Sequence, residues 1–269
     1  MLLAVNHVTR YRYSQPVRGV VQSHRLTPTA TEGQKVLDWQ ITVTDGRKGG
    51  SFRDGAGDLV QSWSVLGPVS EIAVTVTGRV ETKDMSGLLK GARETLAPQT
   101  YLRDTSPTRA DAALAALARS ITPSNDLLDT AHALSGVIAN AIRYSPGATH
   151  AHTTAAEALA LGEGVCQDHA HALIAVARHL DMPARYVSGY LHSSSDGEAH
   201  EAAHAWAEVF VPGLGWVGFD PANRCCPDER YIRLGSGLDA QDASPIRGTA
   251  RGPGKESLDV TVAIAAMQQ

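Results

Sequence analysis

The stretch GEGVCQDHAHALIAVARHL, residues 162–180, carries the strongest functional signal in this chain. Its apolar residues recur at steps of three and four from Ala170 to Leu180, and this spacing predicts a helix with one apolar face. Cys166 falls on that face one turn earlier, at the predicted N-terminus, where free backbone N–H groups and the positive end of the helix dipole favour an anion. A thiolate stabilised there would be a nucleophile. The alternative is a buried and unreactive cysteine, because most free cysteines serve as small apolar side chains.

Length and composition are those of a globular protein with one large or two ordinary domains. The chain has 269 residues, 43% of them hydrophobic, and a formal net charge of −4. That balance gives no basic surface for nucleic acid. The apolar run at the start is too short for a signal peptide, and no run reaches the roughly 20 residues needed to cross a bilayer. We therefore expect a cytoplasmic protein with neither a nucleic-acid nor a membrane partner.

Cysteine usage predicts no disulfide framework. The chain has three cysteines, and Cys225 and Cys226 are adjacent. Adjacent cysteines rarely bridge each other or share one metal-ligand geometry. We expect this pair to be structural.

The first part of the chain, residues 1 to about 83, predicts β structure. Five runs with apolar alternation are separated by breaks rich in Pro, Gly and Asp. They predict an antiparallel β-sandwich or partly open barrel, which we place within a domain of residues 1–105. We find no catalytic constellation there, and its charged residues are most simply solvent-exposed.

From residue 106 the pattern changes to helices followed by strands. Ser106-Pro107 resembles a helix start, residues 126–144 predict a second helix, and a short helix from Thr154 ends at Gly162. After the helix of Cys166, strands are predicted at residues 184–191, 204–211, 216–220 and 258–264. The fold class is therefore α+β, with a second domain of residues 106–269.

A cysteine nucleophile needs a base and a third group that orients the base, and the predicted hairpin supplies both. His204 opens its first strand and Asp220 ends its second. If the turn is residues 212–214, Val211 lies opposite Gly215, and His204 lies diagonally beside Asp220 on one sheet face. A turn of two or four residues would place them on opposite faces. The mechanism requires the three-residue turn, whereas the sequence alone leaves it open.

Three sequence blocks together resemble the bacterial transglutaminase-like superfamily, whose core is related to papain-type cysteine proteases. The blocks are GVCQD at 164–168, HAWAEV at 204–209 and GFDP at 218–221, in the order found in that family. The early RLTP and GQKVLDW segments are similar to the N-terminal domain that accompanies this core. The resemblance implies a nucleophile helix packed on an antiparallel sheet. Its one departure is His169, where the family pattern has an aromatic residue.

The resemblance also implies an activity and its residues. Cys166 would be the nucleophile, His204 the general base and then acid, and Asp220 the orienting group of a catalytic triad. The implied reaction is acyl transfer from an amide or peptide bond of a peptide or protein substrate through a thioester, without a cofactor or metal. Hydrolysis, as in a thiol protease or amidase, is favoured over crosslinking. The oxyanion would bind the Cys166 backbone N–H and a second donor, for which Tyr144 and Trp206 are candidates.

Two other functions remain open at this point. His200-Glu201-x-x-His204 spells a zinc-metallopeptidase motif, although that chemistry requires a helix where the sequence predicts a strand. The histidine pairs near 150 and 170 have no partners that complete a zinc site. A transglutaminase fold can also serve as an inert interaction module, although the presence of all three triad residues favours an enzyme. We expect the remaining polar residues of the motif blocks to support the site structurally: Gln167, Asp168 and Glu208.

Overall fold

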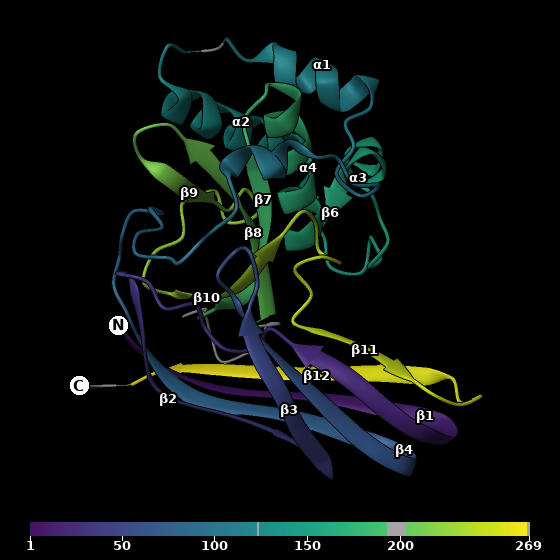
Figure 1. Cartoon of the computed structure of the whole chain (residues 1–269). Coiled ribbons are helices and arrows are strands. Elements are labelled where there is room, and N and C mark those ends of the chain that lie inside the picture. Colours follow the sequence, from purple (N-terminus) through teal and green to yellow (C-terminus); the bar gives the residue numbers. More distant parts are fainter. Residues whose placement is uncertain (123, 193–202, 268–269) are drawn as a thin grey trace.

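The computed structural model describes residues 1–122, 124–192 and 203–267, which form two layers. A long antiparallel sheet makes up one layer, and helices packed around a smaller sheet make up the other (Figure 1). This arrangement confirms the expected α+β class. The large sheet contains β1 (Leu2–His24), β2 (Gln34–Val43), β3 (Gly46–Arg53), β4 (Leu59–Thr82), β11 (Ile246–Ala250) and β12 (Glu256–Ala266).

The second layer holds the segment expected to contain the site. Its smaller sheet has the order β10-β7-β8-β9, with antiparallel neighbours. The elements of this layer are the 3₁₀ helix η1 (Pro98–Leu102), α1 (Ala112–Ser120), α2 (Leu127–Ala141), β5 (Arg143–Tyr144), α3 (Ala155–Leu161), β6 (Glu163–Gly164), α4 (Cys166–His179), β7 (Ala184–Leu191), β8 (Ala203–Val211), β9 (Gly215–Phe219) and β10 (Tyr231–Gly237).

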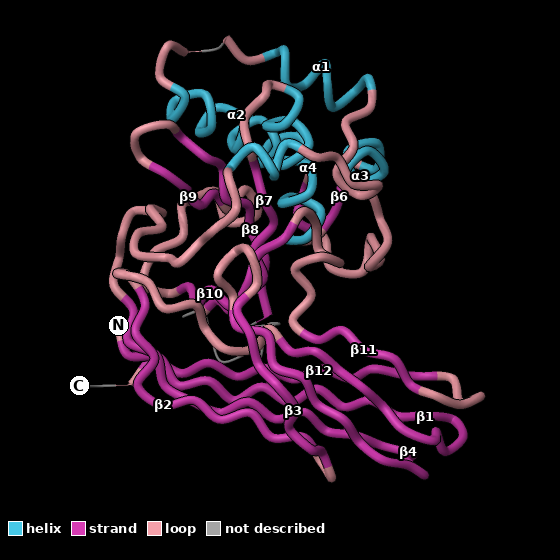
Figure 2. The backbone as a smooth tube through the Cα atoms, viewed as in Figure 1, coloured by secondary structure: helices cyan, strands magenta, loops and turns pink. Residues whose placement is uncertain are grey.

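The large sheet is built on β1 and β4, which are longer than the sequence predicts. Each joins two predicted strands into one, and the pairing between them shifts register between Arg12 and Val17, beside Pro16. Proline cannot donate to the ladder, so the break in the pattern marks an irregularity within a continuous strand. The first half of β1 pairs with β12 and the second half with β11 (Figure 2).

The two C-terminal strands, β11 and β12, lie in the N-terminal sheet, across the division made at residues 105/106. That division assigns residues 106–269 to the catalytic core, whereas β11 and β12 pair with β1 of the N-terminal sheet. The chain thus returns to its first strand after completing the core. β3 is also additional to the predicted strands, because its sequence GRKGGSFR lacks apolar alternation.

An apolar cluster joins the two layers. Alternate residues of β4, such as Val74 and Val76, are fully buried on one face of the large sheet. They belong to the same cluster as Tyr190 of β7 and as Ile232 and Leu234 of β10. Because the smaller sheet supplies part of this core, the two layers stabilise each other.

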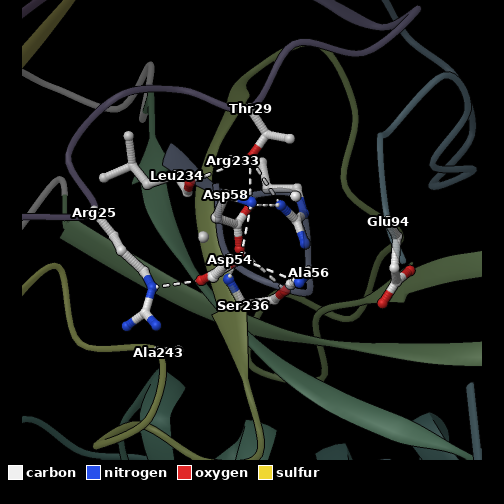
Figure 3. A network of polar contacts seen from close by, with 12 residues as sticks. Arg25, Thr29, Asp54, Ala56, Asp58, Glu94, Arg233, Leu234, Ser236 and Ala243 are labelled. Atoms are coloured by element: carbon white, nitrogen blue, oxygen red, sulfur yellow. Dashed lines mark hydrogen bonds and ion pairs between the residues drawn. The ribbon is translucent and has the colours of Figure 1, made fainter. Parts of the chain in front are cut away.

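A buried network of charges reinforces this junction (Figure 3). Asp58, which immediately precedes β4, is fully buried and accepts from Arg233 of β10 at 2.9 Å and from the backbone N–H of Ser236 at 2.7 Å. Arg233 also donates to Glu208 of β8 at 2.9 Å. Glu208 in turn accepts from Arg185 of β7 at 2.6 Å. The N-terminal domain is therefore tied to the three strands of the smaller sheet that lie beside the site.

The predicted capping chemistry is found at α3, whereas the ends of α1 and α2 differ from the prediction. Thr154 caps α3 through a reciprocal pair of hydrogen bonds with Glu157, and Gly162 ends it in the left-handed conformation, as expected. α2 begins at Leu127, close to the expected start, but its cap is Asp126 instead of the expected Ser124 or Asn125, and it ends at Ala141 because residues 143–144 form β5. The predicted start of the first helix at Ser106 is wrong. Asp111 caps α1, since its side chain accepts from the backbone N–H of Leu114.

Among the described residues, no helix is both long enough and apolar enough to span a bilayer.

Candidate active site

Cys166 is the first residue of α4, and the residues before it are held in place by Asp168. Asp168 accepts from the backbone N–H of Val165 at 2.8 Å and from the hydroxyl of Thr149 at 2.6 Å. Gly164 makes room for this contact, because a Cβ at that position would lie 2.7 Å from the Cβ of Asp168. The spacing Gly-x-Cys-x-Asp thus fixes how the chain enters the helix and where the thiol lies.

The predicted helix is confirmed as α4, and it is buried on its other faces as well as on the apolar one. Every residue from 168 to 178 is buried, including His169, His171 and Arg178. Helices α1, α2 and α3 and strands β7 and β8 all pack against α4. The polar side chains are accommodated by backbone groups: both ring nitrogens of His169 lie 2.9 Å from carbonyl oxygens, of Val165 and of Ile142. His169 therefore fixes the first turn of α4 to the end of α2.

The β8–β9 hairpin has the three-residue connection that the mechanism requires. Val211 lies opposite Gly215, and Ala207 lies opposite Phe219. Continuing this register brings His204 and Asp220 together on one face. His204 Nε2 lies 2.6 Å from Asp220 Oδ2, and the side chains are 8% and 1% exposed. Because Nε2 is taken by Asp220, Nδ1 is the ring nitrogen that can form a hydrogen bond with Cys166.

Cys166 lies within interaction range of His204. Burial acts to lower the pKa of His204, but hydrogen bonding with Asp220 and Cys166, and the charges of both groups, outweigh it and raise this pKa to about 10. Burial alone would raise the pKa of Asp220, whereas its hydrogen bond and charge interaction with His204 hold it below the usual range. The structure thus brings the three predicted residues together and favours an imidazolium at position 204.

Two residues at Asp220 are additional to the sequence-based set. Asn223 Nδ2 donates to Asp220 Oδ2 at 2.7 Å, and the hydroxyl of Tyr231 donates to the same oxygen at 2.8 Å. Asn223 follows Asp220 by three residues in a turn, and local Asp/Asn turn chemistry could have indicated it. Tyr231 comes from β10 through strand pairing, so no local pattern indicates it.

Trp206 covers His204. Their rings stack at a centroid distance of 6.4 Å and an interplanar angle of 26°. The indole lies across Gly189 of β7, where a Cβ would approach its ring carbons to 2.6 Å. Trp206 is 3% exposed, so it shields the imidazole from solvent on that side.

The second oxyanion candidate, Tyr144, lies beside the segment that leads into Cys166. Tyr144 is in β5, directly opposite Gly164 of β6 and so two residues from Cys166 along the partner segment. It is 51% exposed, and its ring lies 6.4 Å from that of His169. Tyr144 thus lies beside the segment that precedes Cys166, whereas Trp206 packs against the ring of His204.

The zinc motif falls partly outside the described residues. His200 and Glu201 lie there, but His204 is the second residue of strand β8 and hydrogen-bonds Asp220. His204 therefore lies in a strand, whereas the motif requires its histidines on one helix. In the described part of the chain, no group of three His, Cys, Asp or Glu side chains converges as a metal site.

The other polar residues of the motif blocks, Glu208, Asp168 and Gln167, hold neighbouring parts of the chain in place. Glu208 holds two buried arginines, Asp168 caps the segment before Cys166, and Gln167 Nε2 donates to the carbonyl of Ala151 at 3.1 Å. None of these three contacts involves the reacting groups.

Two family models match this chain, one on each domain. Residues 115–221 match the transglutaminase-like superfamily, and residues 3–81 match the bacterial transglutaminase-like N-terminal region. An uncharacterized protein of Mycobacterium leprae is 30% identical over 97% of this chain and 98% of its own length. The chain belongs to the transglutaminase-like superfamily. The family that the sequence blocks indicated is thereby confirmed.

Further relatives of this transglutaminase-like protein agree with the assignment. An uncharacterized protein of Mycobacterium tuberculosis is 31% identical over 91% of this chain and 86% of its own length. A solved structure of a candidate cysteine protease from Cytophaga hutchinsonii shares the fold, with a TM-score of 0.76, 23% identity and coverage of 100% of this chain and 91% of its own. A protein-glutamine gamma-glutamyltransferase of Pseudomonas aeruginosa is 34% identical over 28% of this chain and 12% of its own length.

Proposed function

We propose that this protein is a cysteine-dependent enzyme that transfers an acyl group from an amide or peptide bond of a peptide or protein substrate. One observation carries the proposal: buried His204 interacts with both Cys166 and Asp220, and these contacts raise its pKa to about 10. At neutral pH the imidazole is then protonated and can stabilise a thiolate at Cys166. Membership of the superfamily supports the same reaction class.

The chemistry proceeds through two acyl transfers. The Cys166 thiolate attacks the carbonyl carbon, and the oxyanion accepts hydrogen bonds from the Cys166 backbone N–H and a second donor. Of the two candidates, we propose Tyr144, because its strand lies beside the segment that leads into Cys166. His204 then protonates the leaving amine and leaves a thioester. A nucleophile that His204 deprotonates resolves the thioester and regenerates the thiolate pair.

We further propose that water is the acyl acceptor, so that the enzyme hydrolyses its substrate. We propose separately that it acts in the cytoplasm. An amine acceptor would instead give transamidation, the activity for which the Pseudomonas relative is named. Fluorescein-labelled casein with and without dansylcadaverine separates the two. Release of labelled peptides supports hydrolysis, whereas incorporation of dansylcadaverine without release would assign the amine route.

The first test needs no substrate and measures iodoacetamide alkylation of each cysteine by mass spectrometry from pH 4 to 10. We expect Cys166 to be alkylated rapidly at pH 6, where ordinary thiols react slowly. Cys225 and Cys226 are internal controls, because burial raises the pKa of both thiols, that of Cys226 to about 11. The His204→Ala variant should remove the rapid reaction of Cys166 at pH 6 and leave the two controls unchanged.

The opposite result would be equally informative. If Cys166 reacts at pH 6 as slowly as Cys226 in both the wild type and His204→Ala, no thiolate–imidazolium pair exists. The proposed enzyme would then be excluded, and a binding role for the transglutaminase fold would replace it.

The alkaline limb of the pH–activity profile gives a second prediction. Activity requires His204 to carry the proton that it gives to the leaving amine, and a group with a raised pKa keeps its proton to higher pH. We expect kcat/KM on labelled casein to remain high at pH 8 and to fall by half at about pH 10. Asp220→Asn removes part of the cause of the raised pKa and should move this limb to lower pH. A wild-type limb below pH 7 would contradict the assignment of His204.

A further inference from the structure

We propose that Tyr231 is a positioning residue, which holds the Asp220 carboxylate and through it orients His204. This inference rests on the proposed function, because it assigns a role within the same site. Tyr231 opens β10 and pairs with Leu191 at the end of β7, so it reaches the site from a strand that carries none of the three proposed catalytic residues.

The geometry places Tyr231 against both members of the base pair. Its hydroxyl donates to Asp220 Oδ2 at 2.8 Å, the oxygen that also lies 2.6 Å from His204 Nε2. Its ring meets the ring of His204 at a centroid distance of 5.9 Å and an angle of 61°. Tyr231 therefore limits the rotation of the carboxylate by a hydrogen bond and the movement of the imidazole by packing.

Asp220 has two accessory donors, and they differ in how firmly they are held. Asn223 belongs to the turn that follows Asp220, and it is exposed at the surface. Tyr231 is 5% exposed and belongs to an apolar cluster with Val187 and Trp206. A donor fixed in the core defines a position more sharply than a donor on a turn, so Tyr231 sets the carboxylate orientation and Asn223 adds to it.

The hydroxyl of Tyr231 keeps its proton throughout the working pH range. Burial, followed by the charge of Asp220, raises the pKa of Tyr231 far above its ordinary value. The hydroxyl proton is directed at Asp220, and Cys225 Sγ lies 3.3 Å from the hydroxyl oxygen of Tyr231. The Tyr231 hydroxyl can therefore accept a hydrogen bond from the Cys225 thiol while it donates one to Asp220.

The test compares Tyr231→Phe with Tyr190→Phe. Tyr190 is also a buried tyrosine, 1% exposed, and its hydroxyl lies 2.7 Å from His7 Nδ1, so its removal deletes a comparable hydrogen bond without touching Asp220. Two profiles are recorded for each variant: the alkylation rate of Cys166 by iodoacetamide against pH, and kcat and KM for labelled casein against pH.

We expect Tyr231→Phe to lower kcat by about 10- to 100-fold, as for loss of a hydrogen bond to a charged group, with KM unchanged. The hydrogen bond from Tyr231 is one cause of the lowered pKa of Asp220. Its removal raises that pKa, so the acid limbs of the activity and alkylation profiles should move to higher pH. Tyr190→Phe should also lower the unfolding midpoint, but by less, because burial lowers the pKa of its partner His7 to about 4 and the imidazole is neutral, and it should leave both profiles in place.

The outcomes separate the two proposals. If Tyr231→Phe loses stability like Tyr190→Phe and keeps the wild-type kcat and acid limbs, Tyr231 is only a packing residue and the inference is overturned. If wild-type Cys166 shows no rapid alkylation at low pH, the proposed function fails, whatever Tyr231→Phe does.

Discussion

Cys166→Ala is expected to reduce hydrolysis of labelled casein by about 10⁵-fold or more while the protein remains folded, because loss of the nucleophile removes covalent catalysis entirely. The thiol is half-buried at the first position of α4, and the contacts that fix this turn are made by Asp168 and His169 instead. Removing one sulfur atom there should change the free energy of unfolding by less than about 1 kcal/mol. Urea denaturation followed by tryptophan fluorescence measures this second quantity.

Cys226→Ala is the matched control. Cys226 is also half-buried and packs against the same apolar cluster as Cys166, but the groups that raise the pKa of His204 are Asp220 and Cys166. Its replacement should leave turnover within about two-fold of the wild type, since surface-near substitutions outside the site have small effects. Turnover retained in Cys166→Ala, and lost on addition of a chelator, would instead assign the reaction to a metal.

Features set by local chemistry were predictable from the sequence. The capped helix α3 is specified by Thr154, Glu157 and Gly162, which act within one or two turns of each other. The hairpin register depends on a short connection, and the reaction required one particular length. Cys166, His204 and Asp220 could be named before the fold was known because the three sequence blocks that contain them resemble the transglutaminase-like family, whereas the register that brings His204 to Asp220 was left open by the sequence.

Features set by pairing over long distances were not predictable. Tyr231 reaches Asp220 because β10 pairs with β7, and no periodicity in the sequence encodes that contact. β12 pairs with β1 across almost the whole chain, so this last strand lies in the N-terminal sheet. Arg233 and Asp58 are 175 residues apart, and each taken alone resembles an ordinary surface charge.

Arg233→Met is expected to destabilise the protein by about 3–5 kcal/mol, the usual effect of removing one partner from a buried ion pair. The side chains of Arg233, Asp58 and Glu208 are 7%, 0% and 4% exposed. Burial acts to raise the pKa of Glu208, but Arg233 and then Arg185 hold it below its usual value, so Glu208 is an anion that needs both arginines. Methionine fills much of the arginine volume, so the variant removes charge more than packing.

Arg79→Met is the control for the loss of an arginine from an exposed ion pair. Arg79 of β4 pairs with Asp38 of β2, both in the large sheet. Arg79 Nε donates to Asp38 at 2.6 Å, but the two side chains are 49% and 50% exposed. Solvent screens such a pair, and its loss should cost at most about 1 kcal/mol. Urea denaturation of both variants under identical conditions gives the comparison. Equal stability of the two would show that burial adds nothing to the Arg233 network.

The cause of the destabilisation can be separated from its size. If the cost arises from stranded charge, then neutralising Asp58 as well, in the double variant Asp58→Asn and Arg233→Met, should recover part of the lost free energy, because Glu208 keeps Arg185 as its partner. If the cost arises from lost packing, the double variant should be no more stable than Arg233→Met alone.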